Sequence, residues 1–181
     1  MIEDFKKLCS ALKYWNIDLE DPRKSYQTRF ILQKLAYISK ALEYPLKYHF
    51  ILYVKGPYSS SLTADYFNYP NFVSNQDLIQ KFTKDEEIIL KNVQKNILDH
   101  GLMKEHFSEF LETLATITYI KKKNPSFLDD DLFVYTKKEK PYLKDWMIII
   151  GINVVKKIFF SPDFLTEDVK REMELWDLAD D

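Results

Sequence analysis

An apolar run that stops abruptly at a Gly-Pro pair is the feature that most constrains how this chain can fold. Residues 50–54 read Phe-Ile-Leu-Tyr-Val, a β-prone run, and Gly56-Pro57 ends it. Gly56 supplies backbone freedom and Pro57 fixes its own φ, so the pair predicts a turn. The serines that follow can cap a helix that reaches about residue 68. Residues 46–48 belong either to the same strand or to a short partner strand.

Helical periodicity dominates the rest of the sequence. The apolar spacing predicts helices over 2–16, 25–43, 84–101, 102–122, 146–160 and 166–178, and a short helical turn over 77–81. Thr83 and Glu86 form a capping-box pattern that opens the third of these helices, and Gly101 is expected to end it. Residues 128–134 remain open between helix and extended chain, whereas 137–141 reads as a charged, solvated break.

The predicted fold class is mainly α (α+β). It is a compact multi-helix domain with one small β element near residues 46–55, winged-helix-like only loosely. A length of 181 residues suits a single domain over 1–181, since domains commonly hold ~100–200 residues. Only 3 glycines are present, which leaves few tight hairpins and favours helices over a strand-rich fold.

Charge and cysteine content set limits on the class of function. The net charge of -2 does not predict nucleic-acid or membrane binding by the chain as a whole. Cys9 is the only cysteine, so no intrachain disulfide can form, which fits a reducing compartment. The first residues lack the layout of a signal peptide. The run over 146–155 is shorter than the about 20 apolar residues of a membrane span. We therefore expect a cytoplasmic protein without a membrane segment.

Signatures of catalysis and of metal binding are missing from the sequence. No P-loop, nucleophile elbow, Rossmann fingerprint or paired-acid pattern occurs. His49, His100 and His106, with a single cysteine, cannot supply a usual structural zinc set. We expect no enzyme, no cofactor and no metal.

The turn itself is the first candidate site. A helix amino terminus can hold a phosphate or carboxylate, with Lys55 adding charge and the serines adding donors. The alternative is that a serine only caps the helix while Tyr58 packs, which the sequence favours because every helix needs caps. The candidate partner- or phosphate-binding residues are Lys55, Gly56, Pro57, Tyr58, Ser59, Ser60 and Tyr66, with Ser61 beside them.

Further candidates are aromatic and charged clusters. Interfaces favour tyrosine and phenylalanine, so the aromatics after the turn are candidate partner contacts, or else core. They are Tyr58, Tyr66, Phe67, Tyr69 and Phe72. The charged clusters read best as solvated faces, because none matches one basic stripe or a calcium loop. They are Arg23, Lys24, Arg29, Lys34 and Lys40; Lys121, Lys122 and Lys123; Lys137, Lys138 and Lys140; Asp129, Asp130 and Asp131; and Asp177, Asp180 and Asp181.

Two segments together resemble a known family. They are the Gln-Lys-Leu-Ala-Tyr-Ile helix at 33–38 with the strand and turn at 50–62, and the Leu-Glu-Thr-Leu-Ala-Thr-Ile-Thr-Tyr-Ile run at 111–120. This pattern resembles the YwgA-like family and the carboxy-terminal domain of the DarG antitoxin. It is more distantly similar to SocA-like (Panacea) antitoxin domains. The resemblance implies a mostly helical fold and a regulatory or protein-neutralising role without catalysis.

Three functional hypotheses follow from the sequence. The leading one is a non-enzymatic, antitoxin-like regulatory protein that binds a partner protein, such as a toxin. The second is a winged-helix-like DNA-binding transcriptional regulator, so nucleic acid stays open as a partner. The third is a nucleotide- or phosphate-binding protein that uses the turn from Lys55 to Ser61. The oligomeric state is left open.

Overall fold

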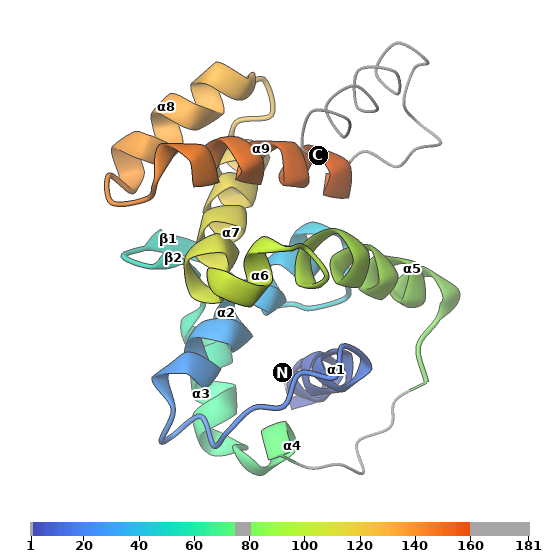
Figure 1. The fold of residues 1–181 in the computed structure, drawn as a ribbon. Coiled ribbons are helices and arrows are strands. Elements are labelled where there is room, and N and C mark those ends of the chain that lie inside the picture. Colours follow the sequence, from blue (N-terminus) through green and yellow to red (C-terminus); the bar gives the residue numbers. More distant parts are fainter. Residues whose placement is uncertain (1, 75–80, 160–181) are drawn as a thin grey trace.

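The computed structural model describes residues 2–74 and 81–159, which form a mainly α-helical structure with one small antiparallel sheet (Figure 1). The helices are α1 (Ile2–Tyr14), α2 (Tyr26–Ala41), α3 (Ser60–Asn68), α4 (Asn71–Ser74), α5 (Lys84–Val93), the π-helical turn η1 (Gln94–Leu98), α6 (Leu102–Glu105), α7 (Phe107–Lys123), α8 (Asp129–Glu139) and α9 (Asp145–Phe159). The sheet consists of β1 (Ile51–Tyr53) and β2 (Gly56–Tyr58). The predicted fold class is confirmed.

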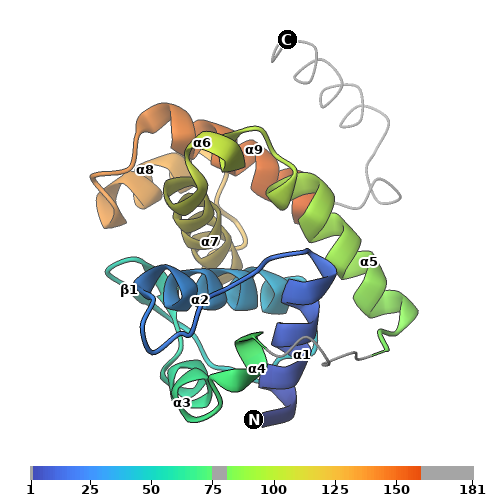
Figure 2. The same ribbon diagram turned by 60° about the horizontal axis from the view of Figure 1, so that its bottom comes forward.

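Helix α7 is the central element of the described core. Helix α2 packs against it on one side and α9 crosses it on the other, as the views in Figures 1 and 2 show. Apolar side chains along its middle are fully buried, among them Phe110, Leu111, Leu114 and Ile117. The small β1–β2 hairpin lies at the edge of the molecule, against α2 and α7.

The crossing of α9 over α7 depends on Gly151. A Cβ at this position would lie 2.8 Å from Ile117 Cδ1 and 3.0 Å from Thr113 Cγ2. Both separations are shorter than ordinary carbon contacts, so a larger residue would force these neighbouring side chains or the helices to shift. The close approach lets the most apolar helix of the chain bury its central turns on α7.

Two tertiary hydrogen bonds connect α1 to α5. Trp15 Nε1, just after α1, donates to Leu90 O at 2.9 Å, and Lys7 Nζ donates to Glu86 Oε1 at 3.1 Å. Glu86 also completes the capping box: Thr83 N donates to Glu86 Oε2 at 2.8 Å, and Glu86 N donates to Thr83 Oγ1 at 3.2 Å. The capping box predicted from the sequence is therefore confirmed.

The Gly-Pro pair is not the turn but the second strand of the hairpin. Antiparallel pairing joins Tyr53 to Gly56, and Leu52 to Pro57. The chain therefore reverses at Val54 and Lys55, earlier than the sequence predicted. Pro57 fits in this strand because the sheet has only two strands and both are edges. Residues 46–48 are not part of a strand.

Several helix boundaries differ from the expected ones. The predicted helix over 102–122 is divided at His106, which has a non-helical ψ of 34°. The predicted helix over 84–101 widens into η1 and ends before Gly101, which caps α6 instead. Residues 128–134, left open before, are mostly helical and lie in α8, where three acidic residues in the first turn complement the helix dipole. The expected helix over 166–178, and nearly all of the turn over 77–81, lie outside the described residues.

Candidate interaction site around the β1–β2 hairpin

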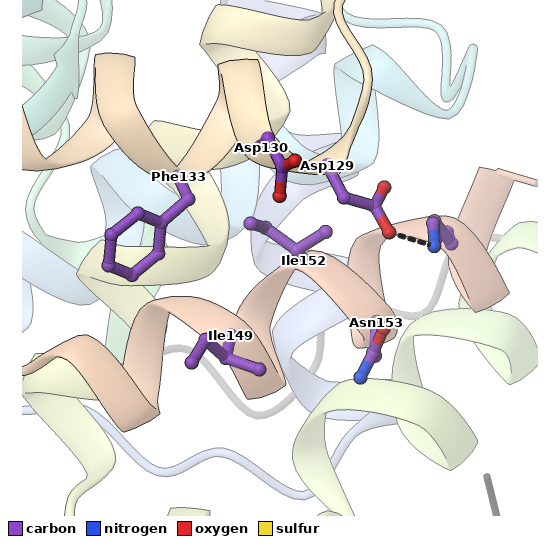
Figure 3. A pocket seen from close by; sticks show the side chains of 7 residues that line it. Asp129, Asp130, Phe133, Ile149, Ile152 and Asn153 are labelled. Atoms are coloured by element: carbon purple, nitrogen blue, oxygen red, sulfur yellow. Dashed lines mark hydrogen bonds and ion pairs between the residues drawn. The ribbon is translucent and has the colours of Figure 1, made fainter.

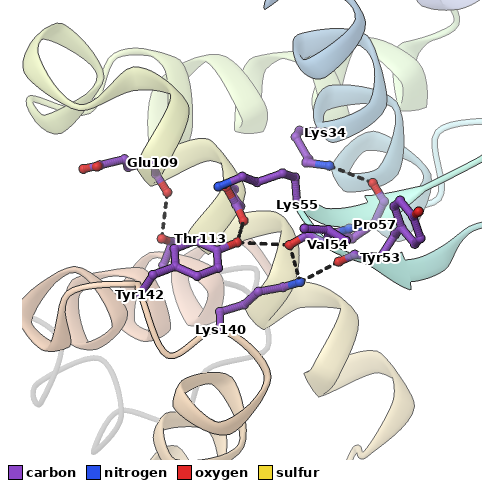
Figure 4. A network of polar contacts seen from close by, with 10 residues as sticks. Lys34, Tyr53, Val54, Lys55, Pro57, Glu109, Thr113, Lys140 and Tyr142 are labelled. Atoms are coloured by element: carbon purple, nitrogen blue, oxygen red, sulfur yellow. Dashed lines mark hydrogen bonds and ion pairs between the residues drawn. The ribbon is translucent and has the colours of Figure 1, made fainter.

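The tip of the hairpin is fixed by two buried lysines from other elements. Lys34 of α2 donates from Nζ to Pro57 O at 2.8 Å. Lys140, just after α8, donates from Nζ to Val54 O at 2.6 Å and also to Tyr53 O (Figure 4). Val54 lies in the turn and both strands are edge strands, so the ammonium groups supply hydrogen-bond donors that a two-stranded ribbon does not itself provide. The hairpin tip is thereby tied to two helices of the core.

A buried carboxylate completes the network. Glu112 of α7 has a residue exposure of only 4%, and its Oε1 accepts a hydrogen bond from Tyr142 OH. Tyr142 OH also lies 3.0 Å from Val54 O, but its single proton goes to the stronger, charged acceptor. Lys55 Nζ lies 3.8 Å from Glu112 Oε2 and 4.3 Å from the centre of the Tyr142 ring, over its face.

Positive charge is in excess in this network. Three ammonium groups, those of Lys34, Lys55 and Lys140, interact electrostatically with the one buried carboxylate of Glu112. The pKa of Lys34 is lowered from 10.5 to about 8, mainly by burial; Glu112 opposes this shift, and Lys140 and Lys55 add to it. Burial likewise lowers the pKa of Lys140, against the raising effect of Glu112 and Glu139. The site is a partly desolvated, electropositive cluster.

Apolar and aromatic side chains lie exposed around the anchored tip. Tyr53 is 60% exposed, Val54 62% and Tyr142 51%. Ile51 lies two residues before Tyr53 on the same strand, so both side chains share one face. Tyr26, at the start of α2, is close enough to Tyr142 to interact with it electrostatically. We call this set the hairpin surface; it comprises Tyr26, Ile51, Tyr53, Val54, Lys55 and Tyr142.

The amino terminus of α3 is occupied by the protein's own side chains. Ser59 N donates to Gln33 Oε1 at 2.8 Å, and Gln33 Nε2 donates to Ser59 O at 3.0 Å. Ser59 Oγ accepts from Leu62 N at 3.3 Å and so caps the helix. Two of the groups that a phosphate would need, the Ser59 and Leu62 N–H donors, are therefore already engaged. The capping interpretation of the serine cluster is the one that the geometry favours.

The predicted site residues fall into two groups. Lys55 and Ser60 are exposed, and Tyr58 is half-buried. The remaining four are buried: Gly56, Pro57, Ser59 and Tyr66. Of the two alternatives left open for Tyr66, contact or core, the structure favours the core, because Tyr66 is 3% exposed and its OH donates to Thr63 Oγ1 at 3.1 Å. Among the other aromatics proposed as contacts, Phe67 and Tyr69 are exposed and Phe72 is half-buried.

Two lysines that sequence reasoning assigned to solvated faces are buried. Lys34 is 3% exposed and Lys140 is 4% exposed, so both assignments are wrong. For Lys34 the sequence held a usable signal: it lies four residues after Phe30 and four before Ile38, on the apolar stripe of its helix. Lys140 has no such signal, because its burial depends on where the hairpin lies in space.

The other basic residues do not form a continuous stripe. Arg23 pairs with Asp21 at 2.6 Å, and Lys40 Nζ donates to Tyr48 O. Lys121 Nζ donates to Phe127 O at 2.6 Å, at the far end of α7. Several of these cations thus serve local capping or pairing, which does not favour a phosphate-tracking surface.

A separate hollow of about 350 Å³ lies between α8 and α9 (Figure 3). Phe133, Ile149 and Ile152 form its apolar wall, and an ion pair between Asp129 and Lys156 lies at its edge. This ion pair is satisfied within the protein, and Asp130 is the remaining charged residue of the lining. Among the described residues, no group of acidic, histidine or cysteine side chains is arranged to hold a metal ion.

Comparison with protein-family models, with curated proteins and with solved structures gave no match. None of the helices in the described parts of the chain is long and apolar enough to cross a membrane.

Proposed function

We propose that this chain is a non-enzymatic regulatory protein that binds a partner protein through the hairpin surface. The observation that carries the proposal is the combination of exposed apolar side chains with a rigidly anchored backbone. Tyrosines are favoured in binding sites because each buries a large area and keeps a polar end. A backbone already fixed by Lys34 and Lys140 loses little conformational entropy on binding.

The resemblance to YwgA-like and DarG-type antitoxin domains supports a specific form of this function. The two segments that carry this resemblance include Lys34, Gly56 and Glu112, which meet in space at the anchored hairpin. The proposed role is therefore antitoxin-like: a cytoplasmic protein that neutralises or regulates a partner, such as a toxin, by direct contact.

Affinity capture from a nuclease-treated lysate of the source cell tests this proposal. The tagged wild-type protein should retain a stoichiometric protein partner, identified by mass spectrometry. Substituting Tyr53→Ser together with Tyr142→Ser should release it, because both side chains are half exposed or more and lie on the hairpin surface. Ile88→Ser is the matched control, since Ile88 is 65% exposed on α5.

Two results would contradict partner binding through this surface. One is capture of the partner that survives the double substitution. The other is an empty bait that carries nucleic acid once nuclease is omitted, which would favour the DNA-binding regulator. A steep fall of binding with salt concentration would then support phosphate contacts.

A further inference from the structure

We infer that the hairpin surface recognises an acidic protein segment that carries apolar side chains. This inference deepens the proposed function, on which it rests, by naming the chemical class of the partner. Its basis is the charge of the lysines in the site, together with the Tyr142 ring against Lys55 and the exposed side chains of the hairpin.

Positive charge exceeds negative charge at the hairpin surface. Lys55 is the exposed cation at the centre of the surface, with half of its side chain accessible to solvent. The buried Lys34 and Lys140 interact electrostatically with it; Glu112 is the buried carboxylate that opposes all three, and Glu139 also opposes Lys140. An anion placed over Lys55 would interact favourably with the excess positive charge, while a cation would be repelled.

Burying the ammonium groups of Lys34 and Lys140 costs free energy. Placing an ammonium group out of water is unfavourable, and apolar residues of similar volume often replace buried charges without loss of stability. Holding a hairpin tip does not by itself require two such groups. Their positive charge, weakly screened because it is buried, instead adds to the potential above Lys55. The anchoring residues thus also bias the surface towards acidic partners.

Apolar side chains lie beside the charged groups of the hairpin surface. Tyr53 and Val54 offer apolar area beside the charge, and the Tyr142 ring lies against Lys55 Nζ. A polyanion without apolar groups would leave this area uncovered. A segment that interleaves acidic and large apolar residues would satisfy both parts of the surface.

Fluorescence anisotropy with synthetic peptides tests the inference on the full chain. The probe is a labelled peptide that alternates glutamate with leucine and tyrosine. Two matched peptides replace each glutamate by glutamine or by lysine. The acidic peptide should bind, the glutamine peptide should bind about tenfold or more weakly, and the lysine peptide should not bind. Binding of the acidic peptide should weaken at roughly 0.5 M salt.

Variants at Lys55 locate the binding. Lys55→Gln should weaken the acidic peptide about tenfold, Lys55→Arg should retain binding, and Lys91→Gln on α5 is the exposed control. Equal binding of the acidic and glutamine peptides, or equal effects of Lys55→Gln and Lys91→Gln, would overturn the inference. If capture of a partner protein requires Tyr53 but not Lys55, the proposed function holds, whereas the inference that the partner presents an acidic segment is rejected. Melting temperatures of the variants exclude unfolding as the cause.

Discussion

The buried ammonium group of Lys34 should make the stability of this protein depend on pH in an unusual direction. Burial lowers its pKa from 10.5 to about 8, so between these values the unfolded chain binds more protons than the folded one. Stability therefore rises as pH increases through this window. Below pH 8 both states are protonated, and the folded state carries the full cost of the buried charge.

The size of the effect follows from the shift in pKa. One pKa unit corresponds to about 1.36 kcal/mol, so the buried charge costs about 3 kcal/mol at neutral pH. Between pH 7 and 9, about 1 kcal/mol of this cost is relieved. Cys9 acts in the opposite direction above pH 9, because burial raises its pKa to about 12. The interval from pH 7 to 9 therefore isolates the lysine best.

Urea unfolding of the wild type and of Lys34→Met, followed by tryptophan fluorescence at several pH values, measures the effect. Methionine removes the buried charge but leaves Pro57 O without its donor, which costs about 1–3 kcal/mol. The two proteins should therefore be similar in stability at pH 7. By pH 9 the wild type should have gained about 1 kcal/mol relative to the variant. If the difference in unfolding free energy between wild type and Lys34→Met stays constant from pH 7 to 9, or changes in the opposite direction, the buried-charge explanation is refuted. Lys91→Met is the control for loss of an exposed lysine.

Three further substitutions test the anchoring and capping contacts by the same unfolding measurement. Gly56→Ala should cost about 1–3 kcal/mol, because φ is 82° and the new Cβ would lie 2.9 Å from Thr116 Oγ1; an unchanged stability would contradict the close approach. Thr83→Ala should cost about 1 kcal/mol through loss of the capping box, and a neutral result would mean that the cap is not formed in solution. Glu112→Gln should cost about 3–5 kcal/mol, because Lys34 and the other two ammonium groups lose their shared carboxylate. A stable Glu112→Gln variant would remove the electrostatic account of the site.

The sequence predicted those parts of the fold that local pattern determines. Helix α7 was recognisable from Phe110, Leu111, Leu114 and Ile117, and all four are fully buried. The capping box at Thr83 was recognisable because both of its hydrogen bonds join residues three positions apart. These patterns can be recognised in the sequence because the contacts that produce them join residues close together along the chain.

The site was harder to predict because its contacts join distant parts of the chain. Lys140 reaches carbonyls that lie more than 80 positions earlier, and no local pattern marks a lysine at a helix end as buried. The Gly-Pro pair predicts a turn at 56–57, since both residues favour turns. In the structure Gly56 opens β2, and its positive φ follows a reversal at Val54 and Lys55. Sequence alone therefore located the first strand, but not its partner strand, the anchoring network or the exposed face.

The most direct test of the central claim is site-specific photo-cross-linking in the source cell, with a photoreactive residue replacing Tyr53. If the hairpin surface binds a partner protein, position 53 should yield one discrete protein adduct. The equally exposed position of Ile88 should yield none. Identification of the adduct by mass spectrometry names the partner, and an acidic contact segment would support the charge argument. Adducts of the same pattern from both positions, or none from position 53, would contradict the account.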